Sequence, residues 1–288
     1  MLMRIPGGPS AIQTHVTNTT DETATMAITV TASGTANAVG SYTELIAATT
    51  FETVGVMVQL AGLQTTGSTN QRCLVNIAVG AAGSEVVLVP NLTCGNTAAI
   101  GAVAGGVGGA MYYFPIYVPT GVRIAASAQA STGTDTVNVA VRMFQQPIGP
   151  TSWVGSRVTA YGADTANSRG TSHTPDVSAN GYKAATQLTA STTYPIRYMQ
   201  LGYDLLSATT GSTSNYLARI GYGATPTYLV SELPIQESTT IESTGFVSAN
   251  FILSQMRFNL AAEQSLHISA MRTASSPAAR GWIVYGVD

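Results

Sequence analysis

The stretch Leu45-Ile-Ala-Ala-Thr-Thr-Phe51 returns as Leu188-Thr-Ala-Ser-Thr-Thr-Tyr194, 143 positions further along the chain. Other pairs of segments recur in the same order at offsets of 143 or 144 positions: Thr65–Thr69 with Thr209–Thr213, Ile77–Ala81 with Ile220–Ala224, Phe114 with Phe258, and Arg123–Ala126 with His267–Ala270. A period of this length is that of a whole domain, because the units of a solenoid span only about 20–50 residues. The 288-residue sequence therefore predicts two similar domains.

Both repeats show the pattern of short β-strands separated by turns. The segment Val137-Asn-Val139-Ala-Val141-Arg-Met143 alternates strictly, as a strand with one buried face does. Turn residues recur about every 8–12 residues, which is typical of an all-β sandwich. The predicted strands cover 26–31, 53–60, 74–79, 85–89, 112–118, 122–127, 137–143, 157–161, 196–201, 216–222, 227–230, 246–253, 266–271 and 282–287. We expect an all-β chain of two tandem, internally duplicated β-sandwich domains that are jelly-roll-like.

The sequence divides into four expected parts. They are an N-terminal arm with a first strand over 1–40, a first sandwich over 41–147, an ordered connector over 148–179 and a second sandwich over 180–288. The arm has no apolar run of the kind found in a signal peptide. A terminal arm is either disordered or docked on a neighbour, and we favour docking. Arg4 and Ile5 are accordingly predicted subunit contacts.

The chain carries few charged residues. Only 9% of its residues are charged and its net charge is −2, whereas about a quarter is usual. Interface cores are depleted in charge, so the composition favours a surface covered by neighbouring subunits; the alternative is a β-protein kept soluble by its hydroxyl groups. Nothing favours binding to nucleic acid or to an anionic membrane, and no stretch reaches the ~20 apolar residues of a membrane span.

The motifs of common enzymes and cofactor sites are absent from the sequence. It contains no Walker loop, no His-Glu-x-x-His and no G-x-S-x-G elbow. The glycine run over 101–109 is interpreted as a loop, because no lysine follows it and a strand is predicted next. We predict no catalytic, cofactor-binding or metal site.

The candidate metal and redox residues are few. His15, His173 and His267 lie far apart in sequence, and the offset places His267 at the position of Arg123. Cys73 and Cys94 are expected to be buried thiols, with a disulfide between them as the alternative.

Three glutamates of the first repeat were considered as glycosidase carboxylates. A glycosidase needs two facing carboxylates. The offsets match Glu44, Glu52 and Glu85 with Gln187, Pro195 and Tyr228, none of which is acidic. We interpret the three as solvated residues and predict that the protein is not an enzyme.

The aromatic cluster over 112–117 has two faces. In a strand, Tyr112, Phe114 and Ile116 point one way and are predicted core. Tyr113 and Tyr117 point the other way and are predicted subunit contacts, with a sugar-binding platform as the alternative. Their matches by offset, Arg257 and Ala261, argue against a sugar site present in both repeats.

Two segments of the first repeat resemble a known group of proteins. Gly80-Ala-Ala-Gly-Ser-Glu-Val-Val-Leu-Val-Pro-Asn-Leu92 and Tyr113-Phe-Pro-Ile-Tyr-Val-Pro-Thr-Gly-Val-Arg-Ile-Ala-Ala126 resemble segments of virion structural proteins of tailed bacteriophages. The resemblance covers roughly residues 41–144. It implies a place on the head or tail of a virion and transfers no catalytic residue.

The expected function is that of a structural component of a phage virion. Our first interpretation is a capsid decoration or cement protein that bridges capsomers. The alternatives are a tail, baseplate or fibre-adaptor protein and, from another class, a carbohydrate-binding module for host recognition. We expect a homo-oligomer, most simply a trimer that presents six similar domains, with the major capsid protein or other virion proteins as partners.

Overall fold

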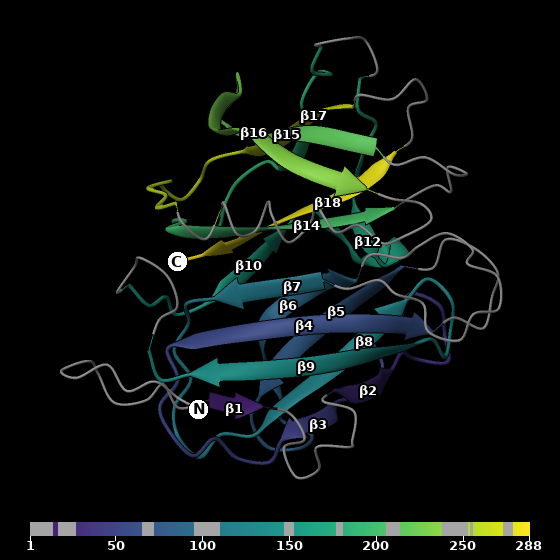
Figure 1. The fold of residues 1–288 in the computed structure, drawn as a ribbon, viewed down its shortest axis with the longest axis vertical. Coiled ribbons are helices and arrows are strands. Elements are labelled where there is room, and N and C mark those ends of the chain that lie inside the picture. The colour runs from purple at the N-terminus through teal and green to yellow at the C-terminus, as the bar shows by residue number, and fades with distance from the viewer. Residues whose placement is uncertain are drawn as a thin grey trace, which may run out of the picture.

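The structure is a computed structural model. It describes residues 14–16, 27–64, 72–94, 110–146, 153–176, 181–205, 214–237, 253, 256–272 and 279–288. These residues form antiparallel strands that are arranged in four sheets (Figure 1). The predicted all-β fold class is confirmed. No helix among the described residues has the length and apolar character needed to cross a membrane.

The first repeat is a sandwich of two sheets. One sheet has the order β1-β9-β4-β7, with β2 also paired to β9, and the other has the order β3-β8-β5-β6. The strands are β1 (Thr14–Val16), β2 (Ile28–Thr31), β3 (Thr43–Ile46), β4 (Gly55–Gln64), β5 (Cys73–Val79), β6 (Val86–Cys94), β7 (Ala110–Phe114), β8 (Ile124–Ala130) and β9 (Thr136–Phe144). Alternate residues of β4 and β9, among them Val58 and Val141, are buried between the sheets.

The second repeat contains counterparts of these strands except β7, whose place in the sequence, with most of the strand predicted over 246–253, lies outside the described residues. Its sheets have the orders β10-β18-β12-β11, with β14 also paired to β18, and β13-β17-β15-β16. The strands are β10 (Val158–Tyr161), β11 (Ala163–Asp164), β12 (Arg169–His173), β13 (Thr186–Thr189), β14 (Tyr198–Leu205), β15 (Ser214–Tyr222), β16 (Thr227–Glu237), β17 (Leu266–Arg272) and β18 (Arg280–Val287). The short 3-10 helix η1 (Thr165–Asn167) lies between β11 and β12.

The connectivity of the first repeat is that of a jelly roll. We number its strands from one to eight along the chain and count β1 and β2 together as one bent first strand. The strands then lie side by side in the order 1-8-3-6 in one sheet and 2-7-4-5 in the other, as in a jelly roll. The described strands of the second repeat follow the same order, with β10 and β12 as the bent first strand and no described strand in the sixth place. The jelly-roll-like duplication therefore rests on strand pairing as well as on sequence.

Local irregularities recur at equivalent positions, as a duplicated domain requires. The pairing register shifts at Leu45 between β3 and β8, and again at Leu188 between β13 and β17. The isolated bridge between Thr53 and Val118 returns between Ile196 and Leu260. Positive φ angles recur in Asn91 and Glu232, in Gly80 and Gly223, and in Gly121 and Glu263.

Strand pairing corrects the equivalences drawn from sequence offsets. Val79 pairs with Ile124 and Tyr222 pairs with Leu266, so the counterpart of Ile124 is Leu266 and not Ile268. Likewise the bridges above make Asn259, not Ala261, the counterpart of Tyr117. Bulges and turns differ in length between the two repeats. A fixed sequence offset therefore misplaces these counterparts by two residues.

The same pairing also moves the repeat boundaries. β10 and β12 lie in the expected connector over 148–179, yet both pair with β18 inside the second sandwich. Their counterparts β1 and β2, placed in the expected arm, pair with β9. Each repeat therefore begins with a strand that the sequence assigned outside it.

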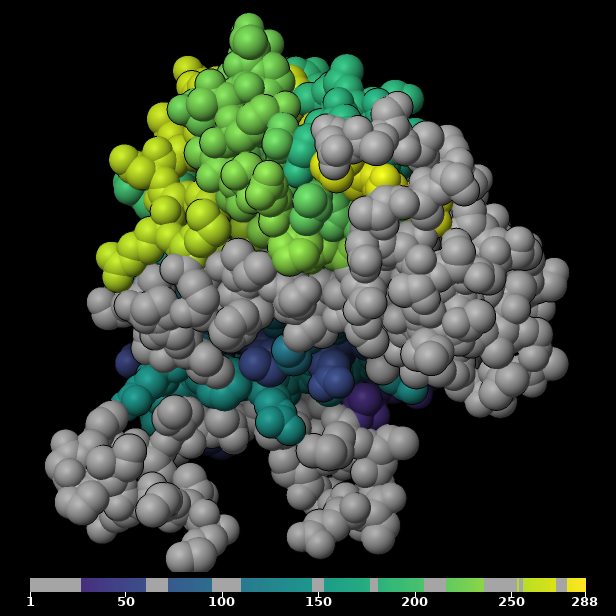
Figure 2. All heavy atoms as spheres, turned by 45° about the horizontal axis from the view of Figure 1, so that its top comes forward, coloured from purple at the N-terminus to yellow at the C-terminus, as the bar shows by residue number. Residues whose placement is uncertain are grey.

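The two repeats are stacked through unlike surfaces. β6 of the first repeat contacts β10 and β14 of the second, and β7 contacts β14. The second repeat accordingly lies above the first in Figure 1, and its green and yellow strands lie above the blue and teal ones in Figure 2. The first repeat contributes the β6 edge of its β3-β8-β5-β6 sheet. The second repeat contributes the outer face of the sheet that contains β10, β14 and β18.

Candidate functional site

The predicted subunit contacts fall in different places. Tyr113 is only 9% exposed, and its ring packs edge-on against Phe144 and against Tyr198 of the second repeat. Tyr117 is 45% exposed and donates a hydrogen bond of 3.2 Å to Glu52. Tyr113 is thus a contact between repeats and not part of an exposed face shared with Tyr117. Arg4 and Ile5 lie outside the described residues.

A buried hydrogen-bond network joins the two repeats. The Tyr285 hydroxyl donates to the backbone oxygen of Asn91 at 2.8 Å and accepts from the amide nitrogen of Thr93 at 2.9 Å. The Tyr112 hydroxyl donates to the backbone oxygen of Thr93 at 2.7 Å. These bonds satisfy the outer edge of β6, which would otherwise leave buried backbone groups unpaired.

Asp204 is the one carboxylate that this network buries completely, among the residues described. It accepts a hydrogen bond of 2.8 Å from the Gly170 amide, while its Oδ1 atom has no hydrogen-bond partner. Burial raises the pKa of Asp204 to about 6, against the lowering effect of the Gly170 bond and of the charges of Arg72 and Arg169. The group lies inside the junction and not in a cleft, so we assign it a structural role.

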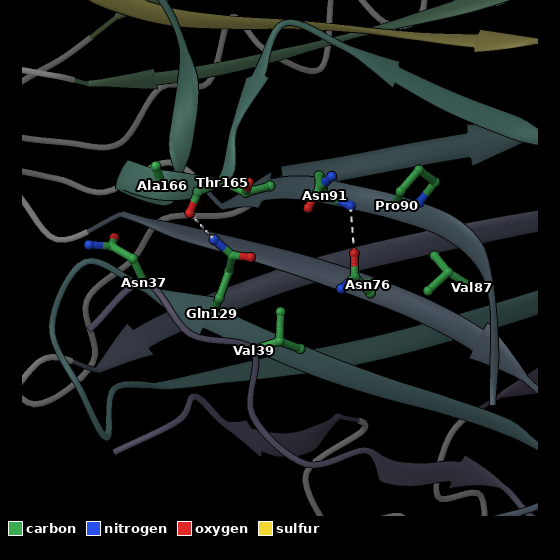
Figure 3. Close-up of a pocket in the computed structure, with 9 residues that line it drawn as sticks. All are labelled: Asn37, Val39, Asn76, Val87, Pro90, Asn91, Gln129, Thr165 and Ala166. Atoms are coloured by element: carbon green, nitrogen blue, oxygen red, sulfur yellow. Dashed lines mark hydrogen bonds between the residues drawn. The ribbon is translucent and has the colours of Figure 1, made fainter. Parts of the chain in front are cut away.

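A hollow of about 580 Å³ lies on the outer face of the β3-β8-β5-β6 sheet, next to η1 (Figure 3). It is lined by Asn37, Val39, Asn76, Val87, Pro90, Asn91, Gln129, Thr165 and Ala166. No charged side chain lines it, and neither does an aromatic one. Its polar lining consists mainly of carboxamides, which carry both donors and acceptors.

Several carboxamide groups in the hollow are available to a ligand. The Asn76 Oδ1 atom accepts from the Asn91 amide at 2.8 Å, and Gln129 Nε2 donates to the Thr165 oxygen at 2.8 Å. Asn37 Oδ1 accepts from Ser168 at 2.8 Å. The opposite ends of these three amides, and the side chain of Asn91, make no hydrogen bond within the described part of the chain.

The second repeat fills the equivalent place with its own side chains. Strand register makes Arg219 the counterpart of Asn76 and Tyr228 the counterpart of Val87. The Arg219 guanidinium lies 3.3 Å from the centre of the Tyr182 ring and 5.2 Å from that of Tyr228. The hollow therefore lies on the sheet of the first repeat, where small and neutral residues replace this stack, and η1 of the second repeat forms one wall.

The acidic candidates form no pair of facing catalytic carboxylates. Arg123 bonds both Glu44, at 2.8 Å, and Glu85, at 2.9 Å, so the two carboxylates share one guanidinium. Backbone hydrogen bonding and the Arg123 side chain hold the pKa of Glu85 below its usual value. Glu52 contacts Tyr117 instead.

The histidines and cysteines have structural surroundings. His173 accepts from the Ala270 amide at 3.1 Å, and burial lowers its pKa to about 4, so the ring is neutral. The backbone oxygen of Ser265 accepts from the Gly223 amide as that of Arg123 accepts from Gly80, so Ser265 is the counterpart of Arg123, which corrects the predicted match with His267. Cys73 and Cys94 are buried opposite each other on β5 and β6 without a disulfide, as expected. Within the described ranges no three His, Cys, Asp or Glu side chains are grouped as a metal site requires.

Sequence reasoning missed both the junction and the hollow. Asn76, Asn91 and Gln129 are scattered over three strands, and only the pairing of β6 and β8 with β5 brings them together. The available signal was a set of polar side chains within otherwise apolar strands. Such residues mark either a satisfied network or a site.

Comparison with protein-family models and with curated proteins finds no match. Among solved structures, the chain is similar to PNGF-II with 10% identity over 90% of this chain and a TM-score of 0.33, and it spans 65% of that structure's length. It is also similar to the tandem CBM22-1–CBM22-2 domains of Paenibacillus barcinonensis Xyn10C, with 10% identity, coverage of 97% and 92%, and a TM-score of 0.25. A structure of infectious bursal disease virus Gx strain gives 12% identity, coverage of 96% and 71%, and a TM-score of 0.24. Scores this low assign neither a family nor a function.

Proposed function

We propose that the chain is a structural component of a phage virion, and specifically a capsid decoration protein that bridges capsomers. The observation that carries the proposal is a duplicated jelly roll in which only 9% of the residues are charged and some of these charges are paired with one another. The ion pairs join Arg123 with Glu44 and Glu85, Arg157 with Asp288, Arg169 with Asp164, and Arg219 with Glu232. With so few charged residues and a net charge of −2, the chain suits many weak, uncharged contacts with neighbours.

Exposed apolar side chains support the same role. Val86 and Val87 on β6, and Tyr228 on the equivalent strand β16, are between 43% and 66% exposed. Both repeats thus present apolar groups on corresponding edge strands, which is a common feature of surfaces that meet a partner. Tail, baseplate and fibre-adaptor proteins have the same requirements and are the closest alternatives.

Cryo-electron microscopy of the source particles tests this proposal. We expect density for the chain on the outside of the shell, between capsomers or at symmetry axes. Density in the tail would move the protein to the adaptor class. Absence of the chain from intact particles would contradict any virion role.

Binding of a neutral saccharide is the second candidate function, and the hollow favours it. Hydroxyl groups of sugars both donate and accept hydrogen bonds, and the ends of the Asn37, Asn76 and Gln129 carboxamides left over from the bonds described above offer both donors and an acceptor. The uncharged lining offers nothing to anions or cations. Without an aromatic platform the affinity would be low.

Saturation-transfer NMR with neutral hexasaccharides, namely maltohexaose, cellohexaose and mannohexaose, tests the second candidate. Val87→Tyr places at the rim the residue that the second repeat carries there, and it should abolish any transfer. Tyr228→Val on the second repeat is the matched control and should leave the transfer unchanged. No transfer to the unaltered protein, or equal loss in both variants, would reject the hollow as a sugar site.

A further inference from the structure

The contact between the two repeats is head-to-tail, and each repeat carries both halves of it. The first repeat contributes the β6 edge, including Asn91 and Thr93. The second contributes the outer face of β14 and β18, including Tyr285. The counterpart of the edge, on β16, and the counterpart of the face, on β4 and β9, have no such contact within the described chain.

The unused edge on the second repeat is exposed. Strand register matches Asn91 with Glu232 and Thr93 with Pro234. Glu232 and Pro234 are both exposed, whereas Thr93 is 1% exposed under the second repeat. Glu232 reaches only Arg219, at 4.0 Å, and its side chain is 65% exposed.

The unused face on the first repeat is exposed as well. Strand register matches Tyr285 with Arg142 and Gly202 with Gln59. Arg142 and Gln59 are exposed, whereas Tyr285 is fully buried. Arg142 has no ion pair among the described residues. This face is visible toward the viewer in Figure 1, where β4 and β9 lie in front.

The two unused surfaces have complementary charge. In the contact within the chain, Tyr285 bonds the backbone of Asn91. The equivalent positions on the unused surfaces hold an arginine, Arg142, and a glutamate, Glu232. A second copy docked in the same sense would bring these opposite charges together, and the longer Arg142 side chain would span the greater separation that Gln59 imposes in place of Gly202.

We propose that the β16 edge of one chain docks on the β4/β9 face of a second copy, in a head-to-tail contact equivalent to the one between the repeats. A contact between unlike surfaces leaves one free surface of each kind, so it continues until a ring closes or a filament grows. The proposal identifies the two surfaces through which the oligomer expected of a virion component would form, and in that respect it rests on the proposed function. Its test uses the purified chain, so its failure would not remove the chain from particles.

Sedimentation velocity over a range of concentrations tests the proposal by charge reversal. Arg142→Glu and Glu232→Arg should each weaken self-association about tenfold, and the double variant should recover most of the loss. Glu263→Arg is the matched control, because Glu263 is also an exposed glutamate with positive φ (63°, against 65° for Glu232) but lies in a turn away from the contact. It should associate like the unaltered protein. A strictly monomeric unaltered chain, or single reversals without effect, would overturn the proposal.

Discussion

The outer faces of two equivalent sheets, β4 with β9 and β14 with β18, have opposite surroundings. On the first repeat the face carries Gln59 and Arg142 and is exposed, while on the second it carries Gly202 and Tyr285 and is buried against β6. The strand pairing behind the two faces is the same. The difference shows that side chains, and not the backbone, decide which face is closed within the chain and which is left for a partner.

The largest expected effect comes from removing the central ring of the buried face. Tyr285→Ala leaves a cavity and deprives the Thr93 amide of its hydrogen-bond acceptor, so the free energy of unfolding should fall by about 3–5 kcal/mol. Arg142→Ala at the equivalent exposed position should change it by less than about 0.5 kcal/mol. Urea unfolding measures both. Similar losses in the two variants would mean that the faces are not different in the way described.

Exchanging the glycine on the buried face should have the next largest effect. A Cβ atom at Gly202 would lie 2.7 Å from the Tyr285 hydroxyl oxygen and 2.9 Å from Thr93 Cγ2, so Gly202→Gln should cost about 2–3 kcal/mol by forcing the repeats apart. The reverse change, Gln59→Gly, should cost less than about 1 kcal/mol, since that face is open. Thermal unfolding of the pair gives the comparison, and an unaffected Gly202→Gln variant would refute the close approach of β14 and β6.

Acidity should have a distinct effect on stability through the buried carboxylate at the junction. The pKa of Asp204 is raised to about 6 in the folded chain from an ordinary value of 3.8, so the folded state binds the proton more tightly than the unfolded state. This group therefore costs most stability above pH 6, up to about 3 kcal/mol, and the cost disappears as the pH falls toward 4. Asp204→Asn should remove this contribution, which leaves the opposite loss of stability that the neutral His173 ring causes as the pH falls from 6.5 toward 4, and it should stabilise the protein at pH 8. Parallel profiles for the two proteins between pH 4 and 7 would contradict the assignment.

The smallest effect is expected at Tyr117, one of the two aromatic residues predicted as subunit contacts. Tyr117→Ala removes an exposed ring with one exposed hydrogen bond and should change the free energy of unfolding by less than about 1 kcal/mol. Tyr113→Ala should cost more, about 2–4 kcal/mol, because its ring is packed against the second repeat. Chemical denaturation measures both losses. A larger loss for Tyr117→Ala than for Tyr113→Ala would support the predicted exposed face shared by the two rings.

Much of the fold could be predicted because it depends on local patterns. Alternation over 137–143 correctly predicted β9, the repeat correctly predicted β18 over 282–287, and the recurring turn residues predicted the sandwich. The first strands of each repeat were assigned to an arm and a connector, since Thr14–Val16 and Val158–Tyr161 share no sequence likeness. Their place is set by pairing with β9 and β18, which are distant in sequence.

The site residues could be predicted less well because they depend on long-range contacts. An alternating pattern predicts which face of a strand a side chain lies on, but not which other part of the chain packs over that face. It therefore placed Tyr113 and Tyr117 on one face, although the second repeat buries only Tyr113. The carboxamides of the hollow come from separate strands and carry no shared motif. The complementary pair Arg142 and Glu232 emerges only when strand register, with its bulges, aligns the repeats.

Disulfide trapping tests the central claim most directly, because it distinguishes a head-to-tail contact from a symmetric one. Cys73 and Cys94 are buried, so cysteines introduced by Arg142→Cys and Glu232→Cys should react without competition. The account predicts disulfide-linked oligomers on mild oxidation of the double variant, joined between positions 142 and 232 by peptide mass spectrometry, and none with either single variant. Equal crosslinking of a single variant, or a double variant that stays a monomer, would contradict it.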